Sequence, residues 1–320
     1  MRVLITGVAG FIGFHIANNL LKNKKNRVYG LDNLDDYYSI SLKKKRIDIL
    51  SNNKKFDFLK LDLKNKKKLF DILKNKKIDF IFHFAAQAGV RYTATNPNKY
   101  ILNNILAFSN MLQLNNFLKV KKFFYASSSS VYGDSNIFPS SEESNLKPKN
   151  IYGLSKKFNE EISDIYVKHS NTRFIGLRFF TVYGEWGRPD MLLIKFFNFA
   201  NSNRVFQVNN YGNHFRDFTY INDVVKIIEV LIKKKINKKH TILNICSSRP
   251  LKLIYVINKL SKITSFKKIK KIKLNDIEVL RTYGDNTKLK RIIKNFKFTK
   301  FETGLKNTYD WFFKFKNLLR

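Results

Sequence analysis

Residues 2–13 read RVLITGVAGFIG, a short apolar run that leads into three glycines, Gly7, Gly10 and Gly13. The run has the length and the branched side chains of a buried strand, and the residues after Gly10 have the apolar spacing of a helix. Glycines at such a turn let the backbone approach a pyrophosphate, which the free amides and the dipole of the helix N-terminus stabilise. The spacing G-x-x-G-x-x-G is also compatible with a turn that serves packing alone. The stretch therefore predicts a strand, a glycine turn and a helix of the kind that binds dinucleotides.

Five more apolar runs predict strands, and helical patterns separate them: RVYGLD, FDFLKL, IDFIFHF, KKFFYAS and RFIGLRF. Strands that alternate with helices pair in parallel through right-handed crossovers, so we expect an α/β fold with a Rossmann-type doubly wound parallel sheet. Beyond this sheet the pattern becomes irregular. We predict a dinucleotide-binding Rossmann domain in 1–178, to which 218–247 returns, and a smaller C-terminal substrate-binding lobe from 179–217 and 248–320. The cleft between them is expected at the carboxyl ends of the strands.

The charge of the chain is strongly positive. Its 320 residues include 61 Lys and Arg against 24 Asp and Glu, which gives a net charge of +37. The lysines form short scattered runs, whereas a nucleic-acid interface needs them on one stripe or face. We therefore expect a solvated surface charge without a specific nucleic-acid partner, which would also steer an anionic substrate toward a cleft.

The cysteine content and the apolar runs indicate in which cellular compartment the protein is expected. The single cysteine, Cys246, excludes an internal disulfide and fits a reducing compartment, and we expect it to be a buried small hydrophobe. The first predicted strand begins at residue 2, which leaves no room for a signal peptide. No apolar run reaches the roughly 18 residues of a membrane-spanning helix, and no Cys/His cluster indicates a metal. The sequence predicts a cytoplasmic protein that makes no membrane contact and holds no metal.

Two carboxylates follow predicted strands at the nucleotide end. Asp32 ends the second strand, where a carboxylate accepts hydrogen bonds from the ribose hydroxyls of an adenosine. The next residue is Asn33 rather than Arg, which favours NAD over NADP because no cation stands there for a 2′-phosphate. Asp62 follows the third strand, where it is expected either to meet the adenine amino group or to cap the next helix.

Tyr152 and Lys156 in YGLSK stand four residues apart, which places both side chains on one face of a helix. An unperturbed tyrosine is a poor base at neutral pH, but a neighbouring ammonium stabilises its phenolate and lowers its pKa. A phenolate could then take a proton from a sugar hydroxyl. A Tyr-x-x-x-Lys pair also arises by chance on helix surfaces, so the pair gains its meaning from the motifs around it.

The glycine turn, a run of four serines before VYG and the Tyr-Lys pair occur in the order and spacing of one family. The chain resembles the extended short-chain dehydrogenase/reductase family, whose members act on nucleotide sugars. The stretches that carry the resemblance are HFAAQAGVRY (83–92), YASSSSVYG (125–133), YGLSKK (152–157), LRFFTVYGEWGRPDM (177–191) and YGNHFRDFTYINDV (211–224). The resemblance is specific up to about residue 225 and looser beyond it.

The resemblance implies a role for each matching residue. Ser128 corresponds to the family's Ser or Thr that bonds the sugar 4-hydroxyl, Tyr152 to the general base, and Lys156 to the residue that holds the nicotinamide ribose and lowers the tyrosine pKa. The residues that match the family's NAD contacts are Gly7, Gly10, Phe11, Ile12, Gly13, Asp32, Asn33, Asp62, Leu63, Ala85, Ala86, Tyr152 and Lys156. Those that match its substrate contacts are Gln87, Arg91, Ser128, Ser129, Ser130, Tyr152, Thr181, Arg188 and Arg216.

These matches imply NAD-dependent C4 epimerisation of UDP-glucuronate to UDP-galacturonate through a 4-keto sugar. A 4-keto uronic acid loses CO₂ when its carboxylate is poorly held. Ser129, Ser130 and Thr181, with Arg188 nearby, are expected to hold the carboxylate in the plane of the ring. Thr181 stands where hexose epimerases of the family usually carry Asn. No Asp or Glu interrupts the serine run, so dehydration lacks an acid or base.

Other activities stay open. A UDP-hexose 4-epimerase or a decarboxylase would keep the same Ser-Tyr-Lys set, and a dinucleotide-sensing regulator on the same fold is a remote alternative. The family also implies a homodimer, because the stretches near 97–117 and 151–169 resemble helices that form a four-helix interface in relatives. Arg281 lies in a stretch that resembles the family's uridine diphosphate region, although Glu278 replaces the usual Asp there. Arg281 is therefore either a diphosphate ligand or a surface residue.

Overall fold

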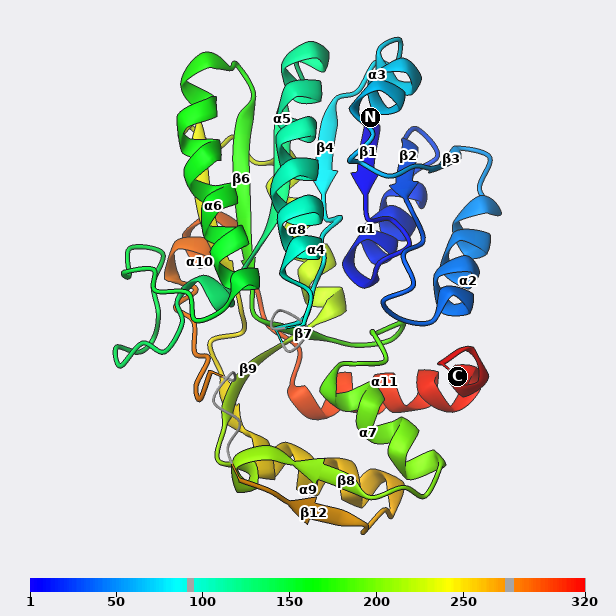
Figure 1. The fold of residues 1–320 in the computed structure, drawn as a ribbon, viewed down its shortest axis with the longest axis vertical. Helices are drawn as coiled ribbons and strands as arrows, with labels where there is room; N and C mark the ends of the chain where they lie inside the picture. The colour runs from blue at the N-terminus through cyan, green and yellow to red at the C-terminus, as the bar shows by residue number, and fades with distance from the viewer. Residues whose placement is uncertain (91–94, 274–278, 320) are drawn as a thin grey trace.

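The computed structural model describes residues 1–90, 95–273 and 279–319. At its centre lies a parallel sheet of seven strands, in the order β10-β6-β5-β4-β1-β2-β3 (Figure 1). The strands are β1 Arg2–Thr6, β2 Arg27–Asp32, β3 Phe56–Lys60, β4 Phe80–His83, β5 Lys122–Ser128, β6 Arg173–Phe179 and β10 His240–Ile245. The order reverses between β1 and β4, which is the switch point where doubly wound sheets bind their ligands. The predicted Rossmann-type fold is confirmed.

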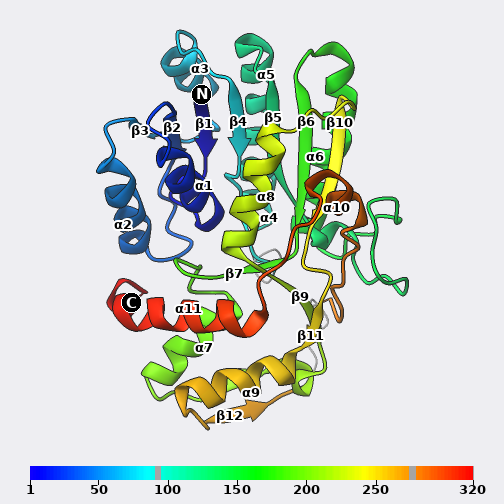
Figure 2. The ribbon, with the colours of Figure 1, turned by 180° about the vertical axis from the view of Figure 1, so that it is seen from behind.

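Helices cover both faces of the sheet. Figure 1 shows α5 and α6 in front of it, and Figure 2, seen from behind, shows α1 and α8 on the opposite face. The helices of these layers are α1 Phe11–Leu21, α2 Ile40–Ser51, α3 Lys66–Leu73, α4 Pro97–Tyr100, α5 Ala107–Leu118, α6 Ile151–Tyr166, α8 Ile221–Lys233 and α10 Thr287–Ile293. A π-helical turn, Ile101–Leu106, joins α4 to α5, and 3₁₀ turns follow β5 (Ser129–Val131) and α6 (Val167–His169). The core accordingly has two main clusters, one on each face.

The rest of the chain lies beyond the carboxyl ends of the strands (Figure 1). It holds a three-stranded sheet, in the order β11-β9-β7, and a parallel pair, β8 and β12. The strands are β7 Thr181–Tyr183, β8 Phe206–Val208, β9 Phe215–Tyr220, β11 Pro250–Lys252 and β12 Ile269–Lys271. The helices are α7 Leu192–Asn201, α9 Leu253–Thr264 and α11 Phe301–Phe315, with 3₁₀ turns at Asn209–Gly212 and Lys316–Leu319. The division of these layers into two domains at residues 178, 218 and 247 stays a prediction. No helix in the described part of the chain is long and apolar enough to cross a membrane.

Candidate active site

One large cavity, of about 1260 Å³, opens between the carboxyl ends of the sheet and the part of the chain beyond them. Nearly every site residue that the sequence predicts lines it: Gly7, Gly10, Phe11, Ile12, Gly13, Asp32, Asn33, Asp62, Leu63, Ala85, Ala86, Gln87, Ser128, Ser129, Ser130, Tyr152, Lys156, Thr181, Arg188 and Arg216. The exception is Arg91, which lies outside the described residues. The structure therefore brings the predicted nucleotide and sugar ends together, although the role of each residue stays a prediction.

The glycine turn is packed too closely for side chains. Gly7 has a φ of +70°, which is left-handed, and a Cβ there would lie 2.6 Å from the backbone nitrogen of Ala85. A Cβ on Gly13 would lie 2.3 Å from the carbonyl oxygen of Gly7. The turn thus leaves bare backbone at the N-terminus of α1, beside the cavity. This cradle fits the pyrophosphate of a dinucleotide.

The carboxylates at the nucleotide end are fixed by backbone amides. Asp32 accepts hydrogen bonds from Ala9 N at 3.0 Å and Leu34 N at 2.9 Å. Burial raises the pKa of Asp32, and these amides and the nearby Lys43 act against that rise. Lys43 also lines the cavity, donates to the carbonyl oxygen of Asp35 and lies 4.4 Å from the centre of the Tyr38 ring. The sequence analysis missed this cation, because it is eleven residues beyond Asp32 and on the next helix.

Asp62 faces the cavity and does not cap the helix that follows it. Its carboxylate accepts from Asn33 Nδ2 at 3.4 Å and from Lys64 N at 2.9 Å. The N-cap of α3 is Asn65, whose side chain accepts from Lys68 N at 3.0 Å. The capping alternative for Asp62 is therefore wrong. A second Asx residue three positions later satisfies the helix terminus instead.

Ser128 and Tyr152 both line the cavity but belong to different elements, a strand and a helix. Ser128 is the last residue of β5, and its hydroxyl accepts from Ser130 N at 3.1 Å. Asn150 caps α6 by accepting from Gly153 N at 2.9 Å, which starts the helix just before Tyr152. Gly153 lets α6 come close to the serine turn, since a Cβ there would lie 2.5 Å from the carbonyl oxygen of Ser130. A glycine next to the tyrosine thus permits the close approach of the two elements.

Burial opposes the charged forms of both Tyr152 and Lys156. The pKa of Tyr152 is raised by burial, while a hydrogen bond with Ser128 and the charge of Arg188 act to lower it. Burial lowers the pKa of Lys156 to about 8. The Lys156 Nζ lies 5.9 Å from the centre of the Tyr152 ring. The sequence analysis expected a lowered tyrosine pKa because of Lys156. The net rise has the opposite sign because desolvation, which spacing along a helix does not reveal, is the largest contribution.

Arg188 lines the cavity and already forms an ion pair with Asp190. Its Nε and Nη2 donate to the two oxygens of Asp190 at 2.9 and 2.5 Å, and Tyr37 donates to the same carboxylate at 3.3 Å. Thr181, at the start of β7, lines the cavity nearby. Arg216 lines it from β9 and donates to the carbonyl oxygen of Phe215 at 2.9 Å. Asp190 is thus a site residue that the sequence analysis missed.

Further polar residues line the cavity beyond Thr181. Lys195 and Asn198 come from α7, and Arg204, Gln207 and Asn209 follow it. The sequence analysis did not identify any of them. One signal was present: Lys195 and Asn198 stand three residues apart in LLIKFFNFA (192–200), so two polar side chains share one face of an otherwise apolar helix. A charged residue at such a position is unusual unless it faces a polar cavity.

Other expectations concern residues away from the reaction. His83 is buried and its Nδ1 lies 2.8 Å from the Thr6 hydroxyl, so it is a packed, hydrogen-bonded residue. Cys246 is buried, as expected of a small hydrophobe. Arg281 does not line the cavity and packs against the rings of Phe138 and Phe215. In the described residues, no group of three or more His, Cys, Asp or Glu could hold a metal ion.

A doubly wound sheet, a bare glycine turn at its switch point and a Tyr-Lys pair beside the same cavity define an enzyme of the short-chain dehydrogenase/reductase type. The model of the NAD dependent epimerase/dehydratase family matches residues 3–246. The chain belongs to this family, and its cofactor is NAD. The family match confirms the resemblance that the sequence motifs indicated.

Individual relatives are similar over nearly the whole chain. An uncharacterized protein of Methanocaldococcus jannaschii is 42% identical over 99% of this chain and 98% of its own length. UDP-glucuronate 4-epimerase 3 of Arabidopsis thaliana is 34% identical over 98% of this chain and 77% of its own length. The structure of UDP-glucuronic acid 4-epimerase from Bacillus cereus, in complex with UDP-glucuronic acid and NAD, is 30% identical, with a TM-score of 0.90. That match covers 98% of this chain and 99% of the other.

Proposed function

We propose that the protein catalyses the NAD-dependent C4 epimerisation of UDP-glucuronate to UDP-galacturonate through a 4-keto intermediate. One observation carries the proposal: a single cavity joins the glycine turn, the Ser128, Tyr152 and Lys156 set, and a group of hydroxyls beside Arg188. The first two features serve hydride chemistry on a sugar hydroxyl. The third suits a sugar that carries a carboxylate, as in the relatives named for UDP-glucuronate.

The chain's own residues fit the cofactor. The bare backbone of Gly7, Gly10 and Gly13 would hold the pyrophosphate. The Asp32 carboxylate would accept hydrogen bonds from the hydroxyls of the adenosine ribose. When bound, NAD would supply the acceptor for the C4 hydride and, once reduced, the donor for the opposite face of the sugar, so that the reaction would have no net redox change. The enclosing cavity would keep the cofactor in place between turnovers.

Tyr152 acts as the general base for the sugar 4-hydroxyl. Ser128 donates a hydrogen bond to the same oxygen and stabilises the charge that develops on it as the proton leaves. Lys156 holds the nicotinamide ribose and supplies the positive charge that favours the phenolate. Because burial opposes ionisation of Tyr152 and Lys156 separately, the tyrosinate and the ammonium support each other as a pair.

The sugar carboxylate is held by Ser129, Ser130, Thr181 and Arg188. Fixing it in the plane of the ring suppresses loss of CO₂ from the 4-keto intermediate. The carboxylate would have to share the Arg188 guanidinium with Asp190. Arg216, with Lys195 and Arg204 further along the cavity, would attract the diphosphate.

The pairing of Arg188 with Asp190 favours a second candidate, a UDP-hexose 4-epimerase. A guanidinium whose charge is already compensated also suits a neutral sugar, which brings no charge of its own. The catalytic set would be unchanged in this alternative. The two candidates differ only in which UDP-sugar turns over.

Proton NMR of the purified protein with UDP-glucuronate, first without and then with added NAD, tests the proposal. The expected result is the anomeric signal of UDP-galacturonate with no pentose signal. If UDP-glucuronate stays unchanged while UDP-glucose is converted, the hexose epimerase is the correct function. If neither sugar changes in the presence of NAD, both candidates are wrong.

We also infer that the enzyme is a homodimer. Large apolar side chains are exposed on the helices near 97–117 and 151–169, namely Ile101, Leu102, Leu106, Phe117, Leu154, Phe158 and Ile165. Exposed apolar side chains gathered on neighbouring helices favour an interaction site, and a second copy of the chain is the proposed occupant. Sedimentation velocity of wild type and of Ile165→Lys tests this inference, since the variant should shift toward the monomer. We also propose that the enzyme is cytoplasmic, as the sequence predicts.

A further inference from the structure

Behind the serine turn lies an ion pair that does not line the cavity. Arg178 on β6 donates from Nε and Nη2 to the two oxygens of Glu160 on α6, at 2.9 and 2.7 Å. Their side chains are only 4% and 6% exposed. Taking two charges out of water has a large desolvation cost, so a buried ion pair is weak evidence for stability and calls for another explanation. The other contacts of the pair supply that explanation.

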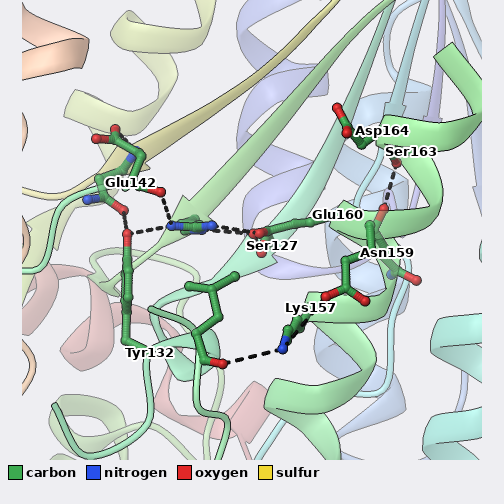
Figure 3. A network of polar contacts seen from close by, with 12 residues as sticks. Ser127, Tyr132, Glu142, Lys157, Asn159, Glu160, Ser163 and Asp164 are labelled. Atoms are coloured by element: carbon green, nitrogen blue, oxygen red, sulfur yellow. Dashed lines mark hydrogen bonds and ion pairs between the residues drawn. The ribbon is translucent and has the colours of Figure 1, made fainter. Parts of the chain in front are cut away.

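Glu160 is bonded to the end of the strand that carries Ser128. The Ser127 hydroxyl donates to Glu160 Oε1 at 2.5 Å, and Figure 3 shows the two side chains meeting between β5 and α6. Ser127 is joined to Ser128 by one peptide bond. Glu160 lies on α6 two helical turns after Tyr152. The carboxylate thus ties the strand of the serine to the helix of the tyrosine.

Arg178 is bonded to the other end of the serine turn. Its Nη1 donates to the Tyr132 hydroxyl at 2.8 Å, and that hydroxyl donates to Asn244 Oδ1 at 2.7 Å. Tyr132 follows the serines in SSSSVYG, separated from Ser130 by one residue, Val131. The ion pair therefore binds both ends of segment 127–132. Of the four serines that line the cavity, Ser127 is itself an attachment point, and Ser128, Ser129 and Ser130 lie between it and Tyr132.

We propose that Glu160 and Arg178 are positioning residues, which hold segment 127–132 against α6 so that the Ser128, Ser129 and Ser130 hydroxyls keep their place relative to Tyr152. This inference rests on the proposed function for its kinetic consequences. It adds a role for two residues that touch neither substrate nor cofactor. A misplacement of about 1 Å near a reacting group can reduce a rate on the order of 100-fold, so attachment of the segment is expected to affect catalysis.

The test uses two substitutions that each remove one hydroxyl and leave the ion pair intact, Ser127→Ala and Tyr132→Phe. The matched control is Ser163→Ala on α6, since the Ser163 hydroxyl is equally buried but donates within its own helix, to Asn159 O at 2.6 Å. We expect kcat to fall about 10- to 100-fold in both test variants, with KM changed less than about threefold. The control should keep the wild-type kcat.

A second measurement follows the titration of Tyr152 directly. The ultraviolet difference between each protein and its Tyr152→Phe counterpart isolates this one phenol. Lys156 on α6, Arg188 after β7 and Tyr100 at the end of α4 face the phenol and are unchanged in the test variants. Because the hydrogen bond from Ser128 lowers the pKa of Tyr152, displacing Ser128 should move the titration to higher pH.

The outcomes separate this inference from the proposed function. If UDP-glucuronate is not converted but Ser127→Ala moves the Tyr152 titration upward, the proposed function is wrong and the positioning role stands. If both test variants match Ser163→Ala in kcat and in the titration, Glu160 and Arg178 have a structural role alone and the inference is overturned. A loss of thermal stability without a change in either readout would also overturn it.

Discussion

Replacing Gly7 by alanine tests the turn on which the nucleotide end depends. The φ of +70° costs an alanine about 1–2 kcal/mol relative to glycine. The added Cβ would also lie 2.6 Å from Ala85 N and 2.8 Å from the carbonyl carbon of Phe84. These are backbone atoms of the adjoining strand end, which cannot rotate away as a side chain would. Relief of such overpacking costs about 1–3 kcal/mol, so the free energy of unfolding is expected to fall by about 2–5 kcal/mol in total.

Thermal unfolding measures this loss, and a titration with NAD measures its effect on the site. At about 2 °C per kcal/mol for a chain of this size, the melting temperature should fall roughly 4–10 °C. The shifted Ala85 backbone also lines the cavity, so NAD should stabilise the variant less than wild type. For wild type, NAD at one hundred times its Kd adds about 2.7 kcal/mol.

Gly10→Ala is the matched comparison within the same turn. Gly10 has a φ of −74°, and a Cβ there has one close contact, 2.9 Å from Gly7 O. Because the backbone of Gly10 is not left-handed, the free energy of unfolding should fall by only about 1 kcal/mol in this variant. If Gly7→Ala melts within about 2 °C of wild type and binds NAD equally well, or if Gly10→Ala is the more damaging change, the account of the turn is incorrect.

Three further predictions concern the reaction. Tyr152→Phe should abolish turnover and leave NAD bound, which the absorbance of the released cofactor and the NMR assay check together; unimpaired turnover would refute the mechanism. In free wild-type enzyme, kcat/KM should rise about tenfold per pH unit and level off near pH 8. The rise follows from the need for a deprotonated Tyr152, whose pKa is raised. The levelling follows from the need for a protonated Lys156, which loses its charge as the pH rises through about 8. Lys156→Met should lose most of the activity and the levelling near pH 8, and a break that persists would assign it to another group. Thr181→Val keeps the volume and removes the hydroxyl, so NMR should detect more UDP-4-keto-pentose, and an unchanged product ratio would argue against a carboxylate-holding role.

The sheet and the reacting groups could be predicted because their signals are local. The apolar runs set the strands, and the glycines that follow the first strand set the switch-point turn. Tyr152 and Lys156 share a helix face by their spacing of four residues alone. The serine run adjoins its strand directly. Each of these signals lies within about ten residues of sequence, so no knowledge of distant contacts was needed.

The missed features depend on the tertiary structure, either through the conformation of a loop or through contacts between distant segments. Asp190 could be recognised as a partner of Arg188 only with the loop conformation known, and its other partner, Tyr37, comes from a different part of the chain. The sign of the Tyr152 shift depends on burial, which the tertiary structure sets. Lys195 and Arg204 enter the cavity from a region with no strong periodicity. For the same reason the two ends of segment 127–132 gave no hint of their shared attachment to Glu160 and Arg178.

The excess of positive charge on this chain stays at its surface, and the exceptions are informative. Within the described residues, the only buried lysines are Lys43 and Lys156, and both line the cavity. Among the arginines that the structure describes, only Arg46 and Arg178 are buried. Arg46 donates to Ala9 O in the glycine turn and to Trp186 O in the loop that carries Arg188, while Arg178 holds the serine turn. Burying a cationic side chain has a large desolvation cost, so lysines and arginines without a structural or functional role should stay exposed to water. The four buried cations of the described residues therefore mark groups that shape the cavity, although the overall charge of the sequence alone would suggest a nucleic-acid partner.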